Sequence, residues 1–299
     1  MKLMRFTLSA LAVFAVFVFF TPFAHSQATR TLVSGVGNDA NPCSRTSPCK
    51  TFAGAISKTA AGGEINCLDP GGFGTVTITK AITIECRHTV GGVLAASVHG
   101  IVVNAGPGDR IVLRGLDIHG TGTGLDGVRF LAGGSLHVED SVISGMQNGI
   151  NIGAGSEVYI KNTYIRNNSN VGVNIAGGGG LLNAVIEKTT VENQAYGLAV
   201  GANTRVTTRG SVYSGSGSGI SAQGGGSAAE VNVDNCVVTN NGIGLYSATQ
   251  GIIRATSSFI SGNTTGVAFG GSGIVATFSD NMLQSNTSDG AFNLALTKN

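Results

Sequence analysis

The densest group of side chains that could act as acids, bases or cations lies between residues 109 and 140. Four of them are candidates for catalysis: Arg114, Asp117, His137 and Glu139. A carboxylate from Glu139 or Asp117, placed beside Arg114 or His137, could carry out the proton transfers that polysaccharide cleavage requires. This chemistry would require the side chains to converge on one long face of the fold.

The same charges also fit a purely structural role, which is the interpretation we prefer. When the repeats of the chain are aligned, one column alternates in sign: Arg114, Glu139, Lys161 and Glu187. Stacked strands lie about 4.8 Å apart, so opposite charges would become neighbours and stabilise the stack modestly. Arg166 and Glu192 form a second predicted pair of this kind.

Metal and phosphate sites find little support in the sequence. His88 and His99 are isolated, and no pair of His, Cys or carboxylate residues has the spacing of a zinc or iron site. The glycine runs at residues 177–180 and 224–226 are expected to form turns rather than phosphate-binding loops. We predict neither a resident metal nor a cofactor.

Aromatic side chains that could stack on sugars are scarce, because the chain has no Trp and only five Tyr. Tyr164 and Tyr213 are expected near strand ends, where they could share a face with Arg166 and Glu192. Packing at the corners of the fold would explain both tyrosines equally well.

A repeat of 22 to 25 residues provides the framework for these side chains. Each unit has a glycine, two or three apolar residues and an apolar-polar strand that ends in Ser, Thr or Asn. The glycines are Gly127, Gly149, Gly172, Gly197, Gly219, Gly244, Gly266 and Gly290. So short a period is typical of a solenoid, and several short strands per unit without a helical pattern favour a parallel β-helix.

Aligned repeats also predict which residues face inward. One β-branched column is expected in the core: Ile118, Ile143, Ile165, Val191, Val212, Val238 and Ile260. Asn168, Asn241 and Asn263 form a second column at a corner, where amides can pair from coil to coil. The coil at residues 197–218 is the least regular, and Arg205 near an inward column predicts a bulge there.

The N-terminal region divides into three parts. Residues 1–26 read as a secretory signal peptide, with Lys2 and Arg5 ahead of an apolar run too short to span a membrane. Residues 27–63 are expected to form a strand, a loop and a capping helix at 51–60 that Gly62 and Gly63 terminate. Residues 64–299 form the predicted β-helix. The chain is thus expected to be secreted or periplasmic, with association with the cell surface as a further alternative, and without a membrane anchor.

Export permits disulfide bonds among the cysteines. Cys43 and Cys49 bracket a short proline-containing loop and are expected to pair. Cys67 and Cys86 could either bridge two coils or lie buried as small apolar side chains, and Cys236 is expected to be a buried thiol. Without Lys2 and Arg5 the basic residues equal the 16 acidic ones. A neutral protein argues against nucleic acid as a partner.

Two segments resemble a known group of proteins. Residues 37–42, Gly-Asn-Asp-Ala-Asn-Pro, and residues 47–52, Ser-Pro-Cys-Lys-Thr-Phe, are similar to the N-terminal region of exported right-handed parallel β-helix proteins of the pectate-lyase-like superfamily. This resemblance implies a superfamily with lyases, glycoside hydrolases, epimerases and adhesins. It implies Asn-x-Asp, Asp-Asp and Gly-His-Gly motifs for the hydrolases, of which only Asn232-Val233-Asp234 is present.

We therefore predict an all-β, single-domain, right-handed parallel β-helix with a short N-terminal capping helix. The predicted function is noncatalytic, with an extended surface that binds a polysaccharide or a cell-surface protein. The alternative is a polysaccharide lyase or glycoside hydrolase with its site between Arg114 and Asp140. Calcium would be expected only with the lyase, because several carboxylates must converge to hold it.

Overall fold

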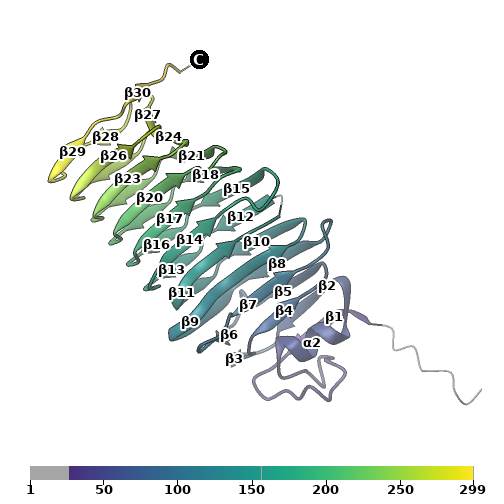
Figure 1. Cartoon of the computed structure of the whole chain (residues 1–299). Helices are drawn as coiled ribbons and strands as arrows, with labels where there is room; N and C mark the ends of the chain where they lie inside the picture. Colours follow the sequence, from purple (N-terminus) through teal and green to yellow (C-terminus); the bar gives the residue numbers. More distant parts are fainter. Residues whose placement is uncertain (1–26, 156, 299) are drawn as a thin grey trace, which may run out of the picture.

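The computed structural model describes residues 27–155 and 157–298. The chain winds into stacked coils in chain order, and the elements nearest the N-terminus and the C-terminus lie at opposite ends of the stack (Figure 1). All strand pairings within the described residues are parallel, as in the register of β10 on β12. The predicted all-β, single-domain solenoid is confirmed. The predicted signal peptide, at residues 1–26, lies outside the described residues.

Each regular coil contributes strands to three faces. Face 1 is one parallel sheet whose strands follow one another along the axis: β1 (Ala28–Val33), β2 (Thr59–Cys67), β5 (Ile82–Glu85), β8 (Arg110–Arg114), β10 (Ser135–Glu139), β12 (Glu157–Lys161), β15 (Leu182–Glu187), β18 (Thr204–Arg209), β21 (Ala229–Asp234), β24 (Gly251–Thr256), β27 (Ile274–Thr277) and β30 (Leu294–Ala295).

Faces 2 and 3 meet at a sharp corner, and the long strands β9 (Leu116–Ala132) and β11 (Val142–Ile152) run through both. Face 2 also contains β3 (Gly71–Gly72), β6 (Gly91–Leu94), β13 (Tyr164–Arg166), β16 (Thr190–Glu192), β19 (Val212–Ser214), β22 (Val237–Thr239), β25 (Phe259–Ser261) and β28 (Met282–Leu283). Face 3 also contains β4 (Val76–Ile78), β7 (Ile101–Asn104), β14 (Val171–Ile175), β17 (Tyr196–Val200), β20 (Ser218–Gln223), β23 (Ile243–Ala248), β26 (Thr265–Gly270) and β29 (Ser288–Gly290).

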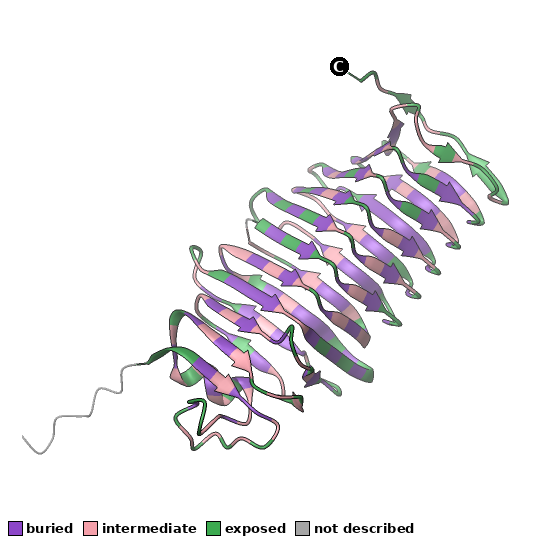
Figure 2. Cartoon of the chain, turned by 180° about the vertical axis from the view of Figure 1, so that it is seen from behind, coloured by how far each residue is buried: buried purple, intermediate pink, exposed green. Residues whose placement is uncertain are grey.

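Alternate side chains along the strands point into the coil, so buried and exposed residues alternate (Figure 2). Face 2 supplies the predicted inward column, which the register confirms for all members but one. Tyr213, and not Val212, pairs with Val191 and is fully buried. The prediction was wrong by one residue because the Tyr213 hydroxyl is satisfied inside the core, 2.8 Å from Thr208 Oγ1.

The corner between faces 2 and 3 contains the predicted asparagine column. Asn263 Oδ1 accepts a hydrogen bond from the backbone N–H of Asn241 at 2.9 Å. Asn286 Oδ1 does the same for the backbone N–H of Asn263. The side chain of Gln194 lies in the same column, where its amide can bond to the backbone of Glu192 on its own coil. These amides satisfy backbone groups that the corner would otherwise leave unpaired.

The N-terminal end is covered by a short helix, α2 (Phe52–Lys58), packed against the first coils (Figure 1). Thr51 is its N-cap, and Thr51 Oγ1 accepts a hydrogen bond from Gly54 N at 2.9 Å. The helix ends at Lys58 rather than at Gly62 and Gly63, because the chain enters β2 directly at Thr59.

Two disulfide bonds lie in this half of the chain. One joins Cys43 to Cys49 in the loop before α2, and the other joins Cys67 to Cys86 across two coils. Cys236 is a buried free thiol. No helix in the described part of the chain is long and apolar enough to cross a membrane.

The expected bulge at residues 197–218 is absent from β18, which pairs with β15 and β21 without a shift in register. Arg205 points outward, and its Nε lies 3.3 Å from Glu230 Oε1 on the next coil. The prediction failed because side chains alternate regularly along β18, so that Thr204 and Val206 point inward and Arg205 between them points outward.

Candidate functional site

The structure brings three of the four predicted catalytic residues together. Arg114 on β8 and Glu139 on β10 are register partners on face 1, with Arg114 Nε 2.9 Å from Glu139 Oε2. His137 lies on the same strand face, its Nδ1 3.8 Å from Glu139 Oε1. Asp117 lies beyond the corner at Gly115, in the face 2 part of β9, and does not join them.

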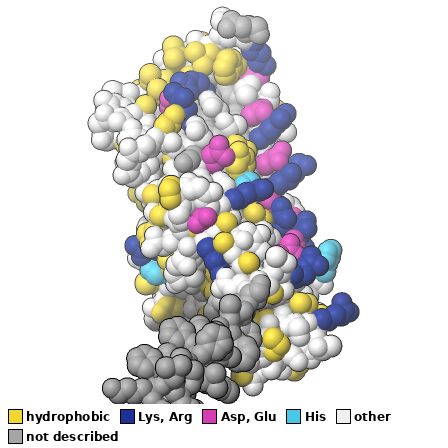
Figure 3. All heavy atoms as spheres, turned by 90° about the vertical axis from the view of Figure 1, so that its right-hand side faces the viewer, with side chains coloured by type: hydrophobic (Ala, Val, Ile, Leu, Met, Phe, Trp, Pro, Cys, Tyr) yellow, Lys and Arg dark blue, Asp and Glu magenta, His cyan; other side chains and the backbone are white. Residues whose placement is uncertain are grey.

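The arginine-glutamate pair belongs to a longer row of alternating charges, which we call the charge ladder. Its members are register partners on successive face 1 strands: Glu85, Arg114, Glu139, Lys161, Glu187, Arg209 and Asp234. Ion pairs link Lys161 Nζ to Glu187 Oε2 at 3.4 Å and Arg209 Nε to Asp234 Oδ2 at 3.1 Å. Basic and acidic side chains alternate down one side of the molecule in Figure 3. The predicted column is therefore confirmed, and it continues in both directions.

Neighbouring groups constrain the protonation of this face. Burial raises the pKa of Glu85, but hydrogen bonds from Arg87 outweigh it, and the pKa is lowered. Burial lowers the pKa of His137, as does the nearby Arg110, whose Nε lies 3.3 Å from His137 Nε2. The imidazole also stacks on Tyr159, with ring centroids 4.6 Å apart. His137 is thus held neutral and packed between its neighbours.

Arg114→Ala and Glu139→Ala should each lower the free energy of unfolding by only about 0 to 1 kcal/mol, because water screens a partly exposed pair. Urea denaturation of each variant and of the double variant measures this directly. A loss of several kcal/mol from either single change would show that the charge ladder is a buried network rather than a surface one.

A second polar cluster lies on face 3, around Asp126 on β9. Asp126 on β9 is 3% exposed, and its Oδ1 accepts hydrogen bonds from Asn148 Nδ2 at 2.8 Å and from Asn151 Nδ2 at 3.2 Å. His99 Nδ1 lies 3.2 Å from Asp126 Oδ2, and His99 Nε2 lies 2.8 Å from an Arg129 nitrogen. His99 was predicted to be isolated, and that prediction was wrong because its partners come from the next coil.

Two rows of amides continue from this cluster along face 3. Asn170 Nδ2 donates to Asn148 Oδ1 at 3.0 Å, and Asn174 Nδ2 donates to Asn151 Oδ1 at 2.9 Å. A carboxylate can only accept hydrogen bonds, so Asp126 forces both first amides to present their NH₂ groups to it. The oxygens of the first amides then accept from the second amides. The Asp126 carboxylate thereby fixes the orientation of every amide in the two rows.

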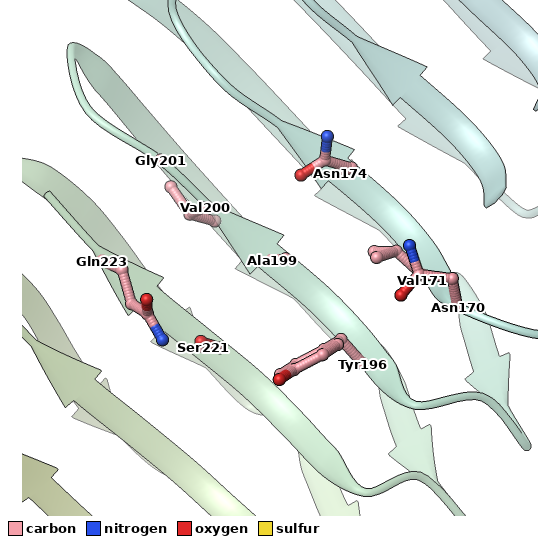
Figure 4. Close-up of a pocket in the computed structure, with 9 residues that line it drawn as sticks. All are labelled: Asn170, Val171, Asn174, Tyr196, Ala199, Val200, Gly201, Ser221 and Gln223. Carbon is pink, nitrogen blue, oxygen red and sulfur yellow. The ribbon is translucent and has the colours of Figure 1, made fainter. Parts of the chain in front are cut away.

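The rows end at a hollow of about 270 Å³ on face 3 (Figure 4). Its floor is low because Ala199 and Ser221, which follow Asn174 in register, have small side chains. Its lining is Asn170, Val171, Asn174, Tyr196, Ala199, Val200, Gly201, Ser221 and Gln223. In Figure 4 the side chains of Tyr196 and Gln223 stand up from neighbouring strands, while the floor between them stays open.

A second hollow of about 360 Å³ adjoins the first on the same face. Tyr196 and Gln223 border both hollows, and Tyr246 closes the far side of the second. Tyr196 is 42% exposed, so its ring is available to a ligand. We call the two hollows together the face 3 groove. Sequence reasoning missed it, although the asparagines at 148, 151, 170 and 174 were a visible polar pattern.

The predicted tyrosines have separate surroundings. Tyr164 lies on face 2 beside Arg166, whose guanidinium carbon is 5.1 Å from the ring centroid, and its hydroxyl bonds to Glu192. Arg166 and Glu192 are register partners, as predicted. Tyr213 is buried and shares no surface with them. Across the described residues, no group of three or more His, Cys, Asp or Glu is placed to hold a metal ion.

Comparison with known proteins identifies the architecture. The family model described as the right-handed beta helix region matches residues 99–265. Pectate lyase Pel9A has 14% sequence identity and a TM-score of 0.66, over 90% of this chain and 78% of the lyase. The A-module of the Azotobacter vinelandii mannuronan C-5 epimerase AlgE6 has 16% identity and a TM-score of 0.59, over 78% of this chain and 70% of the module. None of the curated proteins matches the sequence. At these identities the structural likeness shows the fold alone.

Proposed function

Because this chain belongs to the right-handed beta helix family, we propose that it is an exported protein that binds an extended polysaccharide noncatalytically along face 3. The observation that carries this proposal is the face 3 groove, with its oriented amides, exposed Tyr196 ring and low floor. Two disulfides agree with an oxidising compartment outside the cytoplasm.

The groove offers the two kinds of contact by which proteins bind sugars. The apolar faces of a sugar ring can pack on the flat Tyr196 side chain, which is rigid and has few rotamers to lose. The hydroxyl groups of the sugar can pair with the side chains of Asn170, Asn174 and Gln223. Because the groove is open along the stack, it suits a chain better than a single sugar.

The charged face supports the noncatalytic part of the proposal. Arg114 is paired with Glu139, and His137 is covered by Tyr159 and Arg110. A general base must reach a substrate proton, and these groups are already bonded to one another. Both named structural neighbours are enzymes that act on polysaccharides, so a polysaccharide is the natural ligand class to test first.

The test is binding of the purified chain to a polysaccharide array, followed by titration of the ligands found. Tyr196→Ala should weaken binding by about tenfold, which is about 1.4 kcal/mol, because it removes the aromatic surface on which a sugar ring would pack. Tyr196→Phe should keep most of the affinity. Tyr159→Ala, on face 1, is the matched control, because Tyr159 is 37% exposed and lies outside the groove.

The same samples should be followed for new reducing or unsaturated ends, with and without calcium. We expect none. Turnover that Glu139→Ala abolished would overturn the noncatalytic proposal and favour a lyase or hydrolase on face 1. Equal binding by the wild-type chain and Tyr196→Ala would move the ligand site away from the face 3 groove.

A further inference from the structure

We infer that the face 3 groove selects a neutral glycan and excludes acidic ones. The inference deepens the proposed function and rests on it, since it concerns the chemical class of the same ligand. Two independent observations carry it: the distribution of charge over the three faces, and the orientation of the amides at the edge of the groove.

Face 3 carries no charged side chain over most of its length. Its strand segments at 148–152, 171–175, 196–200, 218–223, 243–248 and 265–270 contain no Asp, Glu, Lys, Arg or His, and all of these residues are described by the structure. Over the same coils, face 1 carries the charge ladder. Proteins recognise carboxylates and sulfates mainly with Arg and Lys, and the groove supplies neither.

Among the cationic side chains on the described face 3 strands, Arg129 lies on the strand nearest to the groove. It lies on β9, three strands before β17, next to Asp126, with its Nε 3.8 Å from Asp126 Oδ2. Its other contact is His99, and none of these three residues lines either hollow of the groove. The Arg129 guanidinium is therefore engaged with Asp126 and His99, away from the groove.

The polarity of the amide rows gives the second argument. Because Asp126 orients the rows, each ends with an amide oxygen, Asn170 Oδ1 or Asn174 Oδ1, at the edge of the groove. Neither oxygen receives a hydrogen bond from the described residues. A free acceptor matches the O–H of a sugar, whereas a carboxylate oxygen facing it would have no proton to share.

Tyr196 divides the groove into two adjoining sites that share one aromatic ring. The sites are stacked along the solenoid, where successive strands lie about 4.8 Å apart, similar to the length of one hexose in an extended chain. The ligand is then a neutral glycan that lies along the axis and crosses the face 3 strands, with at least one sugar on either side of Tyr196.

The experiment compares hexasaccharides of the two classes by calorimetric titration: cellohexaose, mannohexaose and xylohexaose against hexagalacturonate and hexamannuronate. We expect at least one neutral hexasaccharide to bind and both acidic ones to bind about tenfold or more weakly. Raising sodium chloride from about 0.1 to about 1 M shortens the Debye length from about 10 to about 3 Å, and the neutral affinity should change less than about twofold.

Two variants sharpen the result. Lys161→Gln should leave neutral binding unchanged, because Lys161 belongs to the charge ladder on face 1 and lies outside the groove. Gln223→Lys places a cation on the rim of both hollows and should give the chain salt-sensitive binding of hexagalacturonate. Circular dichroism confirms that each variant is folded before it is titrated.

The outcomes separate the two proposals. Tighter binding of acidic hexasaccharides, weakened by salt and by Tyr196→Ala, would overturn the neutral class while leaving glycan binding on this face in place. Neutral binding that Tyr196→Ala did not alter would overturn the assignment to the groove. Failure of every hexasaccharide and every polysaccharide on the array to bind would overturn the proposed function itself.

Discussion

Replacing Ile165 with Asn should lower the free energy of unfolding by about 4 kcal/mol or more. Ile165 is completely buried, and its register partners on the two adjoining coils are Ile143 and Val191. The substitution removes apolar contacts and introduces an amide with no polar partner among these neighbours. The lost apolar contacts and the unpaired amide both lower the free energy of unfolding, because apolar side chains of the core column surround the site on both adjoining coils.

Ile165→Val is the matched control, because it shortens the same side chain without adding a polar group. It should cost about 0.5 to 1.5 kcal/mol. Urea denaturation followed by circular dichroism measures both variants. If Ile165→Asn were no less stable than Ile165→Val, the inward column would not be the core of the fold. A complete failure of Ile165→Asn to appear in the soluble fraction, with Ile165→Val recovered normally, agrees with the prediction.

Buried asparagines elsewhere in the chain show that the free-energy cost of burying an asparagine depends on its position in the coil. Asn263 is 1% exposed, yet its Oδ1 accepts from the Asn241 backbone and its Nδ2 donates to Val238 O. At the corner every neighbouring coil offers a backbone group that needs a partner. At Ile165, in the middle of the inward row of face 2, no such group is free, because the strands already pair with one another.

The architecture could be predicted from the sequence because stacking makes equivalent positions recur. Glycine, β-branched and asparagine columns each repeat with the period of the coil, so their alignment predicts which residues are neighbours. The prediction of the inward residues was wrong where the column changes from aliphatic to aromatic side chains. Tyr213 occupies a place otherwise held by aliphatic residues, since Thr208 inside the core bonds its hydroxyl. An aliphatic pattern alone favoured Val212.

The candidate sites were predicted unequally, for a physical reason. The charge ladder follows from register alone, because each member pairs with the residue at the same position of the next coil. The face 3 groove depends instead on side chains that are small, at Ala199 and Ser221, between neighbours that are large. Small side chains on one coil form a hollow only when the adjacent coils place larger side chains beside them. Neutral residues such as Asn and Tyr also do not indicate a particular reaction.

The glycine column that revealed the repeat is a steric requirement. A Cβ on Gly149 would lie 2.5 Å from the backbone oxygen of Gly172 on the next coil and 2.6 Å from Ile165 Cγ2. Equivalent approaches recur between Gly172 and Gly197 and between Gly197 and Gly219. The strands on either side are hydrogen-bonded about 4.8 Å apart, so the backbone cannot retreat without breaking the ladder.

Gly149→Ala should therefore cost about 3 kcal/mol or more, although alanine is among the least disruptive replacements on an ordinary strand. Gly149 has no positive φ, so the cost is a clash with the next coil and not a strained backbone. The matched control is Gly179→Ala, where a Cβ would meet nothing within 4 Å and the variant should be neutral or slightly more stable. Thermal and urea denaturation of the two variants give the comparison. Equal stability of Gly149→Ala and Gly179→Ala would mean that the coils can separate at this corner, and that the repeat of glycine serves flexibility instead of close stacking.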